Sequence, residues 1–209
     1  KKIQSEIKKF SNYNFDLIFV DDGSNDDTLA KIRDFKKNNS DDINFKIIRL
    51  SKNYGYHIAV SAGIEEVKPG NAAVICPADD YYLFNQIEKM IIKFEEENLD
   101  VVWSIRKKQK DNNISNFLRA IFYKIFITFS GFKNYPKNGT SAFFMISPKL
   151  IKNFLKFKES ERVVNILIYT MGFKQGYIEY FQEKDIRPSN YSFLKKIRLA
   201  VNYIITYSY

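Results

Sequence analysis

The chain has 209 residues, a formal net charge of +9, 45% hydrophobic residues and 16% aromatic residues. This length and composition fit one folded domain, or one domain with an appendage, and exclude a disordered chain. Cys76 is the only cysteine and His57 the only histidine, which excludes an intrachain disulfide and a metal site built from cysteines or several histidines. A divalent cation would need carboxylate oxygens, the ligands that suit Mg²⁺ and Mn²⁺.

The basic charge favours an anionic partner, such as nucleic acid, a phospholipid surface or a phosphorylated substrate. A lysine-rich composition in itself is the alternative explanation. The positive charges are scattered and do not combine with stacking aromatics, so nucleic acid is the least favoured partner. No apolar run approaches the roughly 18 residues of a membrane span, and no signal peptide begins the chain. We expect a soluble or peripheral protein.

The strongest local pattern is an apolar run at residues 17–20 that stops abruptly at Asp21 and Asp22. Such a run predicts a parallel strand buried on both faces. Gly23 allows a sharp turn, and the polar residues 24–26 can cap a following helix. Ligands of open α/β sheets bind at the carboxyl ends of the strands, so the two aspartates are candidate site residues. The alternative is that they only end a strand and cap a helix.

Helical and strand patterns follow along the chain. Periodicity predicts a helix at 29–38, a strand at 45–50, a loop leading into a small-residue helix at 51–64, a strand at 72–76, a helix at 85–97, a strand at 99–105, an amphipathic aromatic helix at 114–132, a helix reaching 171, a strand at 177–180 and a basic-aromatic amphipathic helix at 194–209. The aromatic helix at 114–132 fits either a core or a membrane interface.

Residues Asp21 to Thr28, with the pattern Asp-Asp-Gly-Ser-x-Asp-x-Thr after an apolar strand, resemble the nucleotide-binding segment of family-2 glycosyltransferases. Three later segments resemble the family in the same order. They are the loop Asn53-Tyr54-Gly55 with its alanine-containing helix, the acidic segment after the strand at 72–76, and residues 159–193. The last of these is most similar to the dolichyl-phosphate and bactoprenyl-phosphate glycosyltransferase branch.

The resemblance implies a GT-A fold, which is an α/β fold with a Rossmann-like, mostly parallel central sheet and helices on both faces. This domain would cover residues 1–193, and the helix at 194–209 would lie next to the membrane. In the family, another strand precedes the one that ends at Asp21 and helps to hold the nucleotide. Residues 1–10 have helical spacing instead, so we expect the sheet to lack its first strand.

The resemblance also implies the site. The donor nucleotide would contact Asp21, Asp22, Gly23, Ser24, Asn53, Gly55 and His57. Asp79 would hold Mg²⁺ or Mn²⁺ and act in catalysis together with Asp80, although Pro77 stands where the family has its first metal-binding acid. The alternatives are that His57 is an ordinary helix-start residue and that Asp79 is a helix N-cap.

Phosphate or acceptor contacts are implied for Lys184, Arg187, Ser189 and Tyr191. Near Ser141 the chain has no acid, whereas many family members have an aspartate beside the acceptor there. A sugar hydroxyl needs a general base, but a phosphate acceptor is already ionised at neutral pH. The missing acid therefore favours a lipid phosphate as acceptor.

We accordingly expect an enzyme that transfers a sugar from a nucleotide-diphosphate sugar to a polyprenyl-phosphate lipid, with metal assistance, in cell-envelope glycan synthesis. It would act at the cytoplasmic face of the membrane, and it could form a homo-oligomer. One alternative is a glycosyltransferase that uses a glycan hydroxyl as acceptor. Another is a catalytically impaired relative that binds nucleotide or membrane.

Overall fold

The computed structural model describes residues 9–10, 12–38, 44–107, 123–124, 128, 136, 140–157 and 163–181. The chain divides into two compact units, one made of Lys1–Trp103 with Ala142–Gly176 and the other of Ser104–Ser141 with Tyr177–Tyr209. Every candidate site residue that the structure describes belongs to the first unit. The predicted boundary at residue 193 lies outside the described residues. Across the described ranges, no helix combines the length and apolar character needed to cross a membrane.

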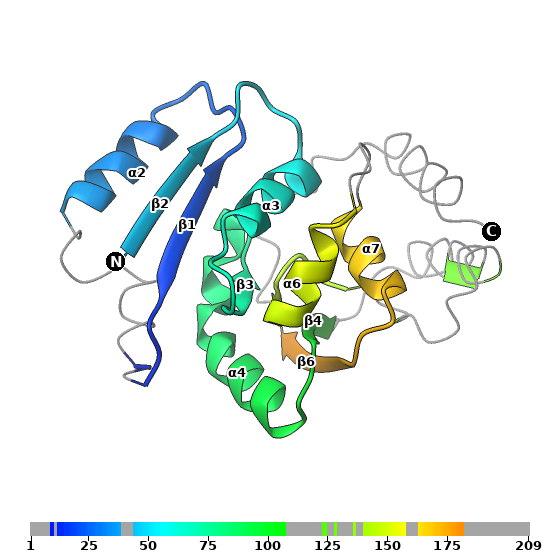
Figure 1. The fold of residues 1–209 in the computed structure, drawn as a ribbon. Helices are drawn as coiled ribbons and strands as arrows, with labels where there is room; N and C mark the ends of the chain where they lie inside the picture. The colour runs from blue at the N-terminus through cyan, green and yellow to red at the C-terminus, as the bar shows by residue number, and fades with distance from the viewer. Residues whose placement is uncertain are drawn as a thin grey trace. The chain divides into compact units, whose positions relative to one another are not determined.

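The described chain contains helices and strands along its whole length (Figure 1). In order they are β1 (Asp16–Asp21), α2 (Thr28–Lys37), β2 (Asn44–Arg49), α3 (Tyr56–Glu65), β3 (Ala73–Ile75), the 3₁₀ helix η1 (Ala78–Gln86), α4 (Ile87–Glu96), β4 (Val101–Lys107), β5 (Phe144–Ile146), α6 (Pro148–Phe154), α7 (Val164–Thr170) and β6 (Gln175–Phe181). The predicted strands and the helix at 29–38 are present within two residues of their expected ends. The predicted helix at 85–97 is divided into the end of η1 and α4, and β5 and α6 were not predicted.

The first sheet consists of β1 and β2, which run parallel and place Asp21 opposite Arg49. An aromatic cluster joins these strands to the crossover helix α2. Phe19 and Phe45 stack at 6.1 Å, and Phe35 of α2 meets them edge-on at 6.3 and 5.5 Å. Because this packing fixes the register, it brings the last residues of both strands to the same sheet edge.

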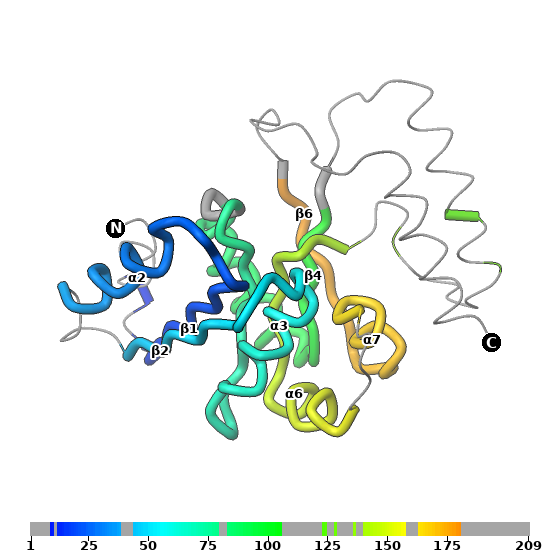
Figure 2. Tube along the Cα trace, turned by 90° about the horizontal axis from the view of Figure 1, so that it is seen from above, coloured from blue at the N-terminus to red at the C-terminus, as the bar shows by residue number. Residues whose placement is uncertain are grey.

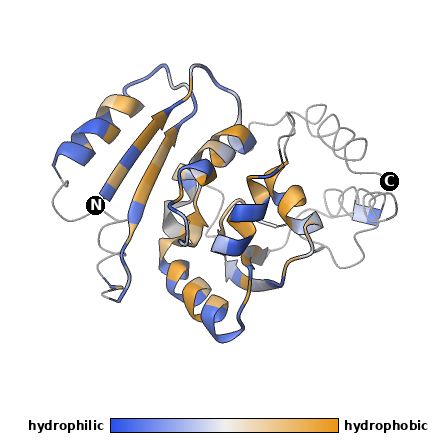
Figure 3. Cartoon of the chain, in the orientation of Figure 1, coloured by the Kyte–Doolittle hydropathy of each residue, from blue (hydrophilic) through white to orange (hydrophobic). Residues whose placement is uncertain are grey.

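Helix α3 packs against β1, so that β1 lies between α2 and α3 (Figure 2). This helix approaches β1 closely at Gly63. A Cβ atom there would lie 3.2 Å from Cγ2 of Val20. Figure 3 shows that β1 is mostly hydrophobic, that β2 is divided between hydrophobic and hydrophilic residues, and that α2 is mostly hydrophilic, as expected of a helix with one face in solvent.

The second sheet has the order β3-β5-β4-β6, with β5 antiparallel to both β3 and β4. It contains the best-buried part of the core, including Trp103, Phe143 and Phe144, none of which is exposed. The rings of Trp103 and Phe144 are 4.8 Å apart, and the Trp103 Nε1–H donates to Oε1 of Gln175 at 2.7 Å. This bond satisfies the indole donor inside an apolar core.

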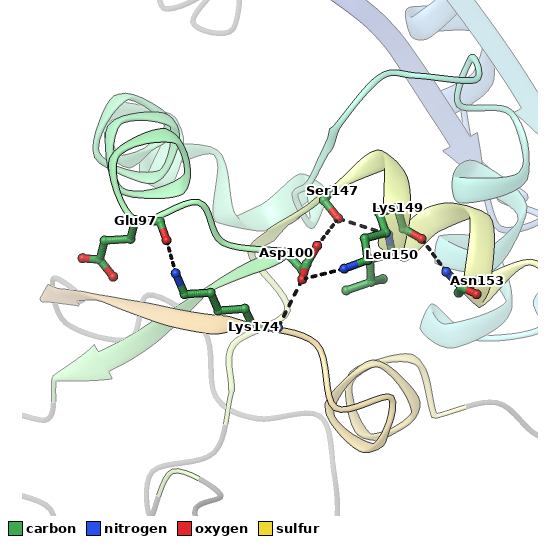
Figure 4. A network of polar contacts seen from close by, with 7 residues as sticks. All are labelled: Glu97, Asp100, Ser147, Lys149, Leu150, Asn153 and Lys174. Atoms are coloured by element: carbon green, nitrogen blue, oxygen red, sulfur yellow. Dashed lines mark hydrogen bonds and ion pairs between the residues drawn. The ribbon is translucent and has the colours of Figure 1, made fainter.

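Asp100 organises the polar side of this core (Figure 4). Its carboxylate accepts hydrogen bonds from the Ser147 hydroxyl at 3.1 Å and from the Lys174 backbone N–H at 3.3 Å. The Ser147 oxygen in turn accepts the Leu150 N–H at 3.0 Å and so caps α6. The Lys174 ammonium donates to the backbone carbonyl of Glu97. These contacts are structural and hold the starts of β4, α6 and β6 together.

Two details differ from the sequence-based expectation. The arrangement is mixed, with β1–β2 parallel and both pairings of β5 antiparallel, because strand direction depends on how distant segments return to the sheet. In addition, residues 17–20 are half-buried instead of buried, since β1 has one partner strand among the described residues. Among the described strands, β1 and β3 belong to different sheets, so Asp21 and Asp79 do not follow strands that are hydrogen-bonded to each other.

Candidate functional site

Asp21 closes the turn at the end of β1. Its Oδ1 accepts the backbone N–H of Ser24 at 3.0 Å. Its Oδ2 is buried, has no hydrogen bond within the described residues, and lies 3.7 Å from Nε of Arg49. The Asp21 side chain is 0% exposed, whereas that of Arg49 is 54% exposed. A buried carboxylate oxygen without a hydrogen bond destabilises the folded protein. A ligand that donates an N–H to this oxygen would therefore bind favourably.

Asp22 points from the same turn to the loop at residues 51–55. Its Oδ1 accepts the backbone N–H of Tyr54 and its Oδ2 that of Gly55, both at 2.8 Å. Charge-assisted bonds of this kind are short and strong. The carboxylate therefore holds the loop by two consecutive amides.

Gly23 brings the two backbones into direct contact. Its φ is +69°, and a Cβ atom would lie 2.4 Å from the carbonyl carbon of Lys52 and 2.7 Å from the nitrogen of Asn53. Only glycine fits a left-handed conformation at such a distance. The structure thus brings together the two segments predicted to hold the nucleotide, which are the turn at 21–24 and the loop at 51–55.

His57 lies in the first turn of α3 and joins it to the start of α7. Its Nδ1 accepts the backbone N–H of Val164 at 3.3 Å, which requires the neutral ring. Burial lowers the pKa of the imidazole below its usual 6.5. The neighbouring Tyr56 hydroxyl donates to the carbonyl of Ala142 at 3.0 Å. In the structure, His57 therefore makes a contact that stabilises the fold.

This contact predicts a pH dependence of stability. The unfolded chain binds a proton at His57 near pH 6.5, and the folded chain binds it only at lower pH. Stability should therefore be fully present above pH 6.5 and be lost as the pH falls toward the folded pKa. We expect the Tm to fall between about pH 7.5 and pH 5.5, and the change to be smaller in His57→Gln. Equal pH slopes in calorimetry of the two proteins would contradict this assignment.

Asp79 lies within η1 and is exposed. In the part of the chain that the structure describes, its carboxylate makes no hydrogen bond or ion pair. It is not an N-cap, because Pro77 holds that position for η1 and Gln86 for α4. Asp80 follows in the same 3₁₀ helix, and its side chain lies outside the described residues. No described residue therefore competes with a ligand for the Asp79 carboxylate.

The described residues could hold a metal ion only together with oxygen ligands from a bound substrate and water. No group of three His, Cys, Asp or Glu side chains among the described residues could hold a metal ion. Asp79 would supply one carboxylate, and phosphate oxygens of a ligand with water would complete the shell. Mg²⁺ is commonly bound in this manner, through one or two carboxylates and substrate phosphates.

Several predicted residues lie outside the described part of the chain. They are Lys184, Arg187, Ser189 and Tyr191, together with the helix at 194–209. Conversely, sequence reasoning missed Arg49 and Tyr56. Arg49 could have been found, because it ends the strand that follows the Asp21 strand and parallel pairing places such ends side by side. The Tyr56 contact with Ala142 has no local signal.

An α/β fold with an acidic turn after its first described strand, a glycine loop packed on that turn and an exposed aspartate after a later strand has the arrangement expected of a GT-A domain. Residues 2–155 match the model of the family described as Glycosyl transferase family 2, and the chain belongs to this family. The predicted family and fold are thereby confirmed.

The chain is similar to several curated proteins. It is 30% identical over 207 residues to the uncharacterized glycosyltransferase YkcC of Bacillus subtilis, covering 98% of this chain and 62% of that protein. It is 31% identical over 106 residues to the undecaprenyl-phosphate 4-deoxy-4-formamido-L-arabinose transferase of Pseudomonas savastanoi, which covers 50% of this chain and 30% of that protein. The chain thus spans less than two thirds of these relatives.

Among solved structures, the fold resembles the mannosyltransferase PcManGT from Pyrobaculum calidifontis in complex with GDP-Man and Mn²⁺. The TM-score is 0.52 at 14% identity, and the match covers 97% of this chain and 66% of that one. This likeness supports the GT-A fold.

Proposed function

We propose that this chain is the catalytic domain of a glycosyltransferase that uses a nucleotide-diphosphate sugar as donor. The observation that carries the proposal is the turn at 21–24, where a buried Asp21 oxygen has no hydrogen-bond donor among the described residues and the loop at 51–55 packs directly on Gly23. Family membership supports the same reading.

In this proposal the donor nucleotide binds to the turn at 21–24 and the loop at 51–55. Asp21 accepts an N–H group of the base, which supplies the donor that its Oδ2 lacks. Gly23, Ser24, Asn53 and Gly55 form the surrounding wall, and Asp22 belongs to the site through the loop that it holds. His57 lies at the edge of this wall, at the start of α3.

The proposed metal-binding and catalytic residues are Asp79 and its neighbour Asp80. When bound, Mg²⁺ or Mn²⁺ would neutralise the charge that develops on the leaving diphosphate. Asp79 is suited to hold it, because its exposed carboxylate has no competing partner among the described residues. The likeness to a structure solved with GDP-Man and Mn²⁺ is consistent with this proposal.

For the acceptor we propose a polyprenyl phosphate at the cytoplasmic face of the membrane. The similarity to an undecaprenyl-phosphate 4-deoxy-4-formamido-L-arabinose transferase over half of the chain supports this acceptor. The missing acid near Ser141 also suits an acceptor that needs no general base. Lys184 and Arg187, with Ser189 and Tyr191, would contact its phosphate or that of the donor.

A second candidate is a catalytically impaired relative, favoured by Pro77 in place of an acid. The deciding assay incubates the chain with UDP- and GDP-sugars and undecaprenyl phosphate, with Mn²⁺ or with EDTA. We expect release of UDP or GDP that depends on metal and on the lipid, is abolished by EDTA, and returns when Mn²⁺ is restored. Nucleotide binding without turnover would support the impaired relative. Turnover with a glycan but not with the lipid would replace the proposed acceptor.

A further inference from the structure

We propose that the carboxyl end of α6 is a docking surface for an anionic lipid bilayer. This surface, which we call the α6 tip, consists of Lys149, Lys152, Leu155, Lys156 and Phe157. None of these residues belongs to the candidate donor site. Binding to a bilayer requires neither a nucleotide nor an acceptor, so the inference goes beyond the proposed function. Only its use in sugar transfer rests on that function, in which the acceptor is a membrane lipid.

Helix α6 has one side in the core and one side in solvent. The core side consists of apolar residues that are at most 6% exposed, namely Leu150, Ile151 and Phe154. On the solvent side, Lys149, Lys152 and Lys156 are all exposed, the last in the turn that follows the helix. Their spacing of three and four residues places them in one row. The lysines are thus not required for packing of the core.

Two exposed apolar side chains accompany the lysines. Leu155 is 36% exposed and Phe157 is 38% exposed. The other large apolar side chains that are strongly exposed in the described part of the chain are Tyr13, Tyr54 and Ile92, which are far from one another in the sequence. Single exposed apolar residues are normal, whereas a pair within three residues is a candidate binding surface.

The backbone holds this pair in place. The N–H groups of residues 155–157 donate to the carbonyls of Ile151, Asn153 and Phe154 at 3.0, 3.1 and 3.1 Å. The helix thus closes in a tight turn, and its last core side chain, Phe154, is fully buried. Leu155 and Phe157 are therefore presented from an ordered backbone.

The charge of the α6 tip favours an anionic occupant. Residues 148–157 contain three lysines and no acid, and the glutamates at 159 and 161 lie outside the described residues. Lys149 lies 3.8 Å from Asp100, which offsets part of its charge. The Lys156 ammonium donates to Oδ1 of Asn153 at 3.0 Å, and Asn153 donates in turn to the Lys149 carbonyl (Figure 4). Lys152 has no ion-pair partner in the described ranges.

Lysines beside exposed leucine and phenylalanine suit the interface of an anionic bilayer. The apolar side chains can enter between the headgroups, while the lysine ammonium groups contact lipid phosphates at the ends of their aliphatic stems. A bilayer also accommodates a convex helix end, because lipids rearrange around it. A lipid surface therefore accounts for both the charge and the exposed apolar pair.

Helix α4 provides the contrasting case. Ile92 is 47% exposed, more than either apolar residue of the α6 tip. Its neighbours one turn away are three acids and one base, namely Glu88, Lys89, Glu95 and Glu96. An anionic surface would repel this net negative group. The two sites therefore separate the effect of apolar exposure from that of charge.

Phe157→Trp in the full chain gives a test at the site itself. The probes are vesicles of phosphatidylcholine with and without phosphatidylglycerol. With phosphatidylglycerol we expect the emission of the new tryptophan to shift to the blue and to be quenched by brominated lipid. Phosphatidylcholine alone should have little effect. The native Trp103 is fully buried, and its signal is subtracted using wild type. Ile92→Trp is the matched control and should show neither change.

Vesicle sedimentation then measures the contribution of each kind of side chain. The double variant Lys152→Gln/Lys156→Gln should bind phosphatidylglycerol vesicles about twentyfold more weakly. Leu155→Ser/Phe157→Ser should bind about tenfold more weakly. Thermal melts of the same samples verify that each variant is folded.

Two controls match these variants. Lys36→Gln/Lys37→Gln removes the same charge from the last turn of α2, which has no strongly exposed large apolar residue among those described. Ile92→Ser removes an exposed apolar side chain from α4. Both should bind within about twofold of wild type, because charges far from the surface are screened.

Several outcomes would overturn the proposal. If wild type binds no vesicles, or binds equally well without phosphatidylglycerol, the α6 tip does not dock on anionic lipid. Vesicle binding without a spectral change in Phe157→Trp would assign docking to another segment. Equal losses in the two lysine pairs would indicate a general charge effect. Binding to poly-L-glutamate but not to vesicles, with the same dependence on Lys152 and Lys156, would indicate an acidic protein partner. Nucleotide turnover is assayed separately, so failure of the proposed function would leave these results unchanged.

Discussion

Asp79→Asn should abolish metal-dependent sugar transfer and leave the fold intact. The substitution removes the charge of the single carboxylate proposed to hold the metal, and the remaining amide is a poor ligand for a hard cation. We expect kcat to fall at least about a hundredfold, by analogy with the loss of other groups that stabilise charge in a transition state. Stability should change by less than about 0.5 kcal/mol, because the side chain is exposed and has no described partner.

The measurement is the rate of UDP or GDP release at saturating Mn²⁺, with a thermal melt on the same samples. Glu88→Gln is the control, because Glu88 is an exposed acid in the first turn of the following helix, α4. It removes the same charge from the neighbouring element and should leave turnover unchanged. Wild-type turnover in Asp79→Asn would remove Asp79 from the proposed metal site, and equal losses in both variants would point to a general electrostatic effect.

Gly23→Ala should destabilise the protein by about 2–5 kcal/mol, combining a left-handed backbone penalty with overpacking. The added Cβ would lie 2.4 Å from the backbone carbon of Lys52, at a φ of +69°. A backbone atom cannot rotate away as a side chain can, so the loop at 51–55 must shift. Nucleotide affinity should fall along with stability.

Gly172→Ala separates the two contributions. Gly172 has nearly the same φ, +70°, but no described atom lies within 4 Å of its Cβ position. It should lose only the backbone part, about 1–2 kcal/mol. Urea unfolding of the two variants gives the cost of the contact by difference. Equal losses would mean that the loop moves away from Gly23 at little cost, and that the turn and the loop are not a rigid unit.

Much of the fold could be predicted because its signals are local. The run at 17–20 that ends in two acids marked β1 correctly, and the periodicity at 29–38 located α2. The strand β5 was missed because the apolar run at 143–146 has four residues, and so short a run does not distinguish a strand from part of a buried helix. Helix α6 does have a local start signal, Ser147 followed by Pro148.

The candidate site, like the fold, could be predicted only in part. Sequence patterns indicated which segments belong together, but they treated Asp21 and Asp22 alike. The structure separates them, because one side chain turns into the interior beside Arg49 and the other bonds the loop amides. Successive residues leave a strand in opposite directions, so two adjacent acids rarely share one environment.

By itself, the sequence determined the family, the α/β character and the identity of the acidic turn and glycine loop, because each depends on residue types at short spacing. Only the tertiary structure decided that Gly23 must be glycine, that His57 accepts a hydrogen bond from Val164, and that β1 and β3 belong to separate sheets. Each of these depends on atoms that are distant along the chain, and their meeting is set by packing, which local propensity does not encode.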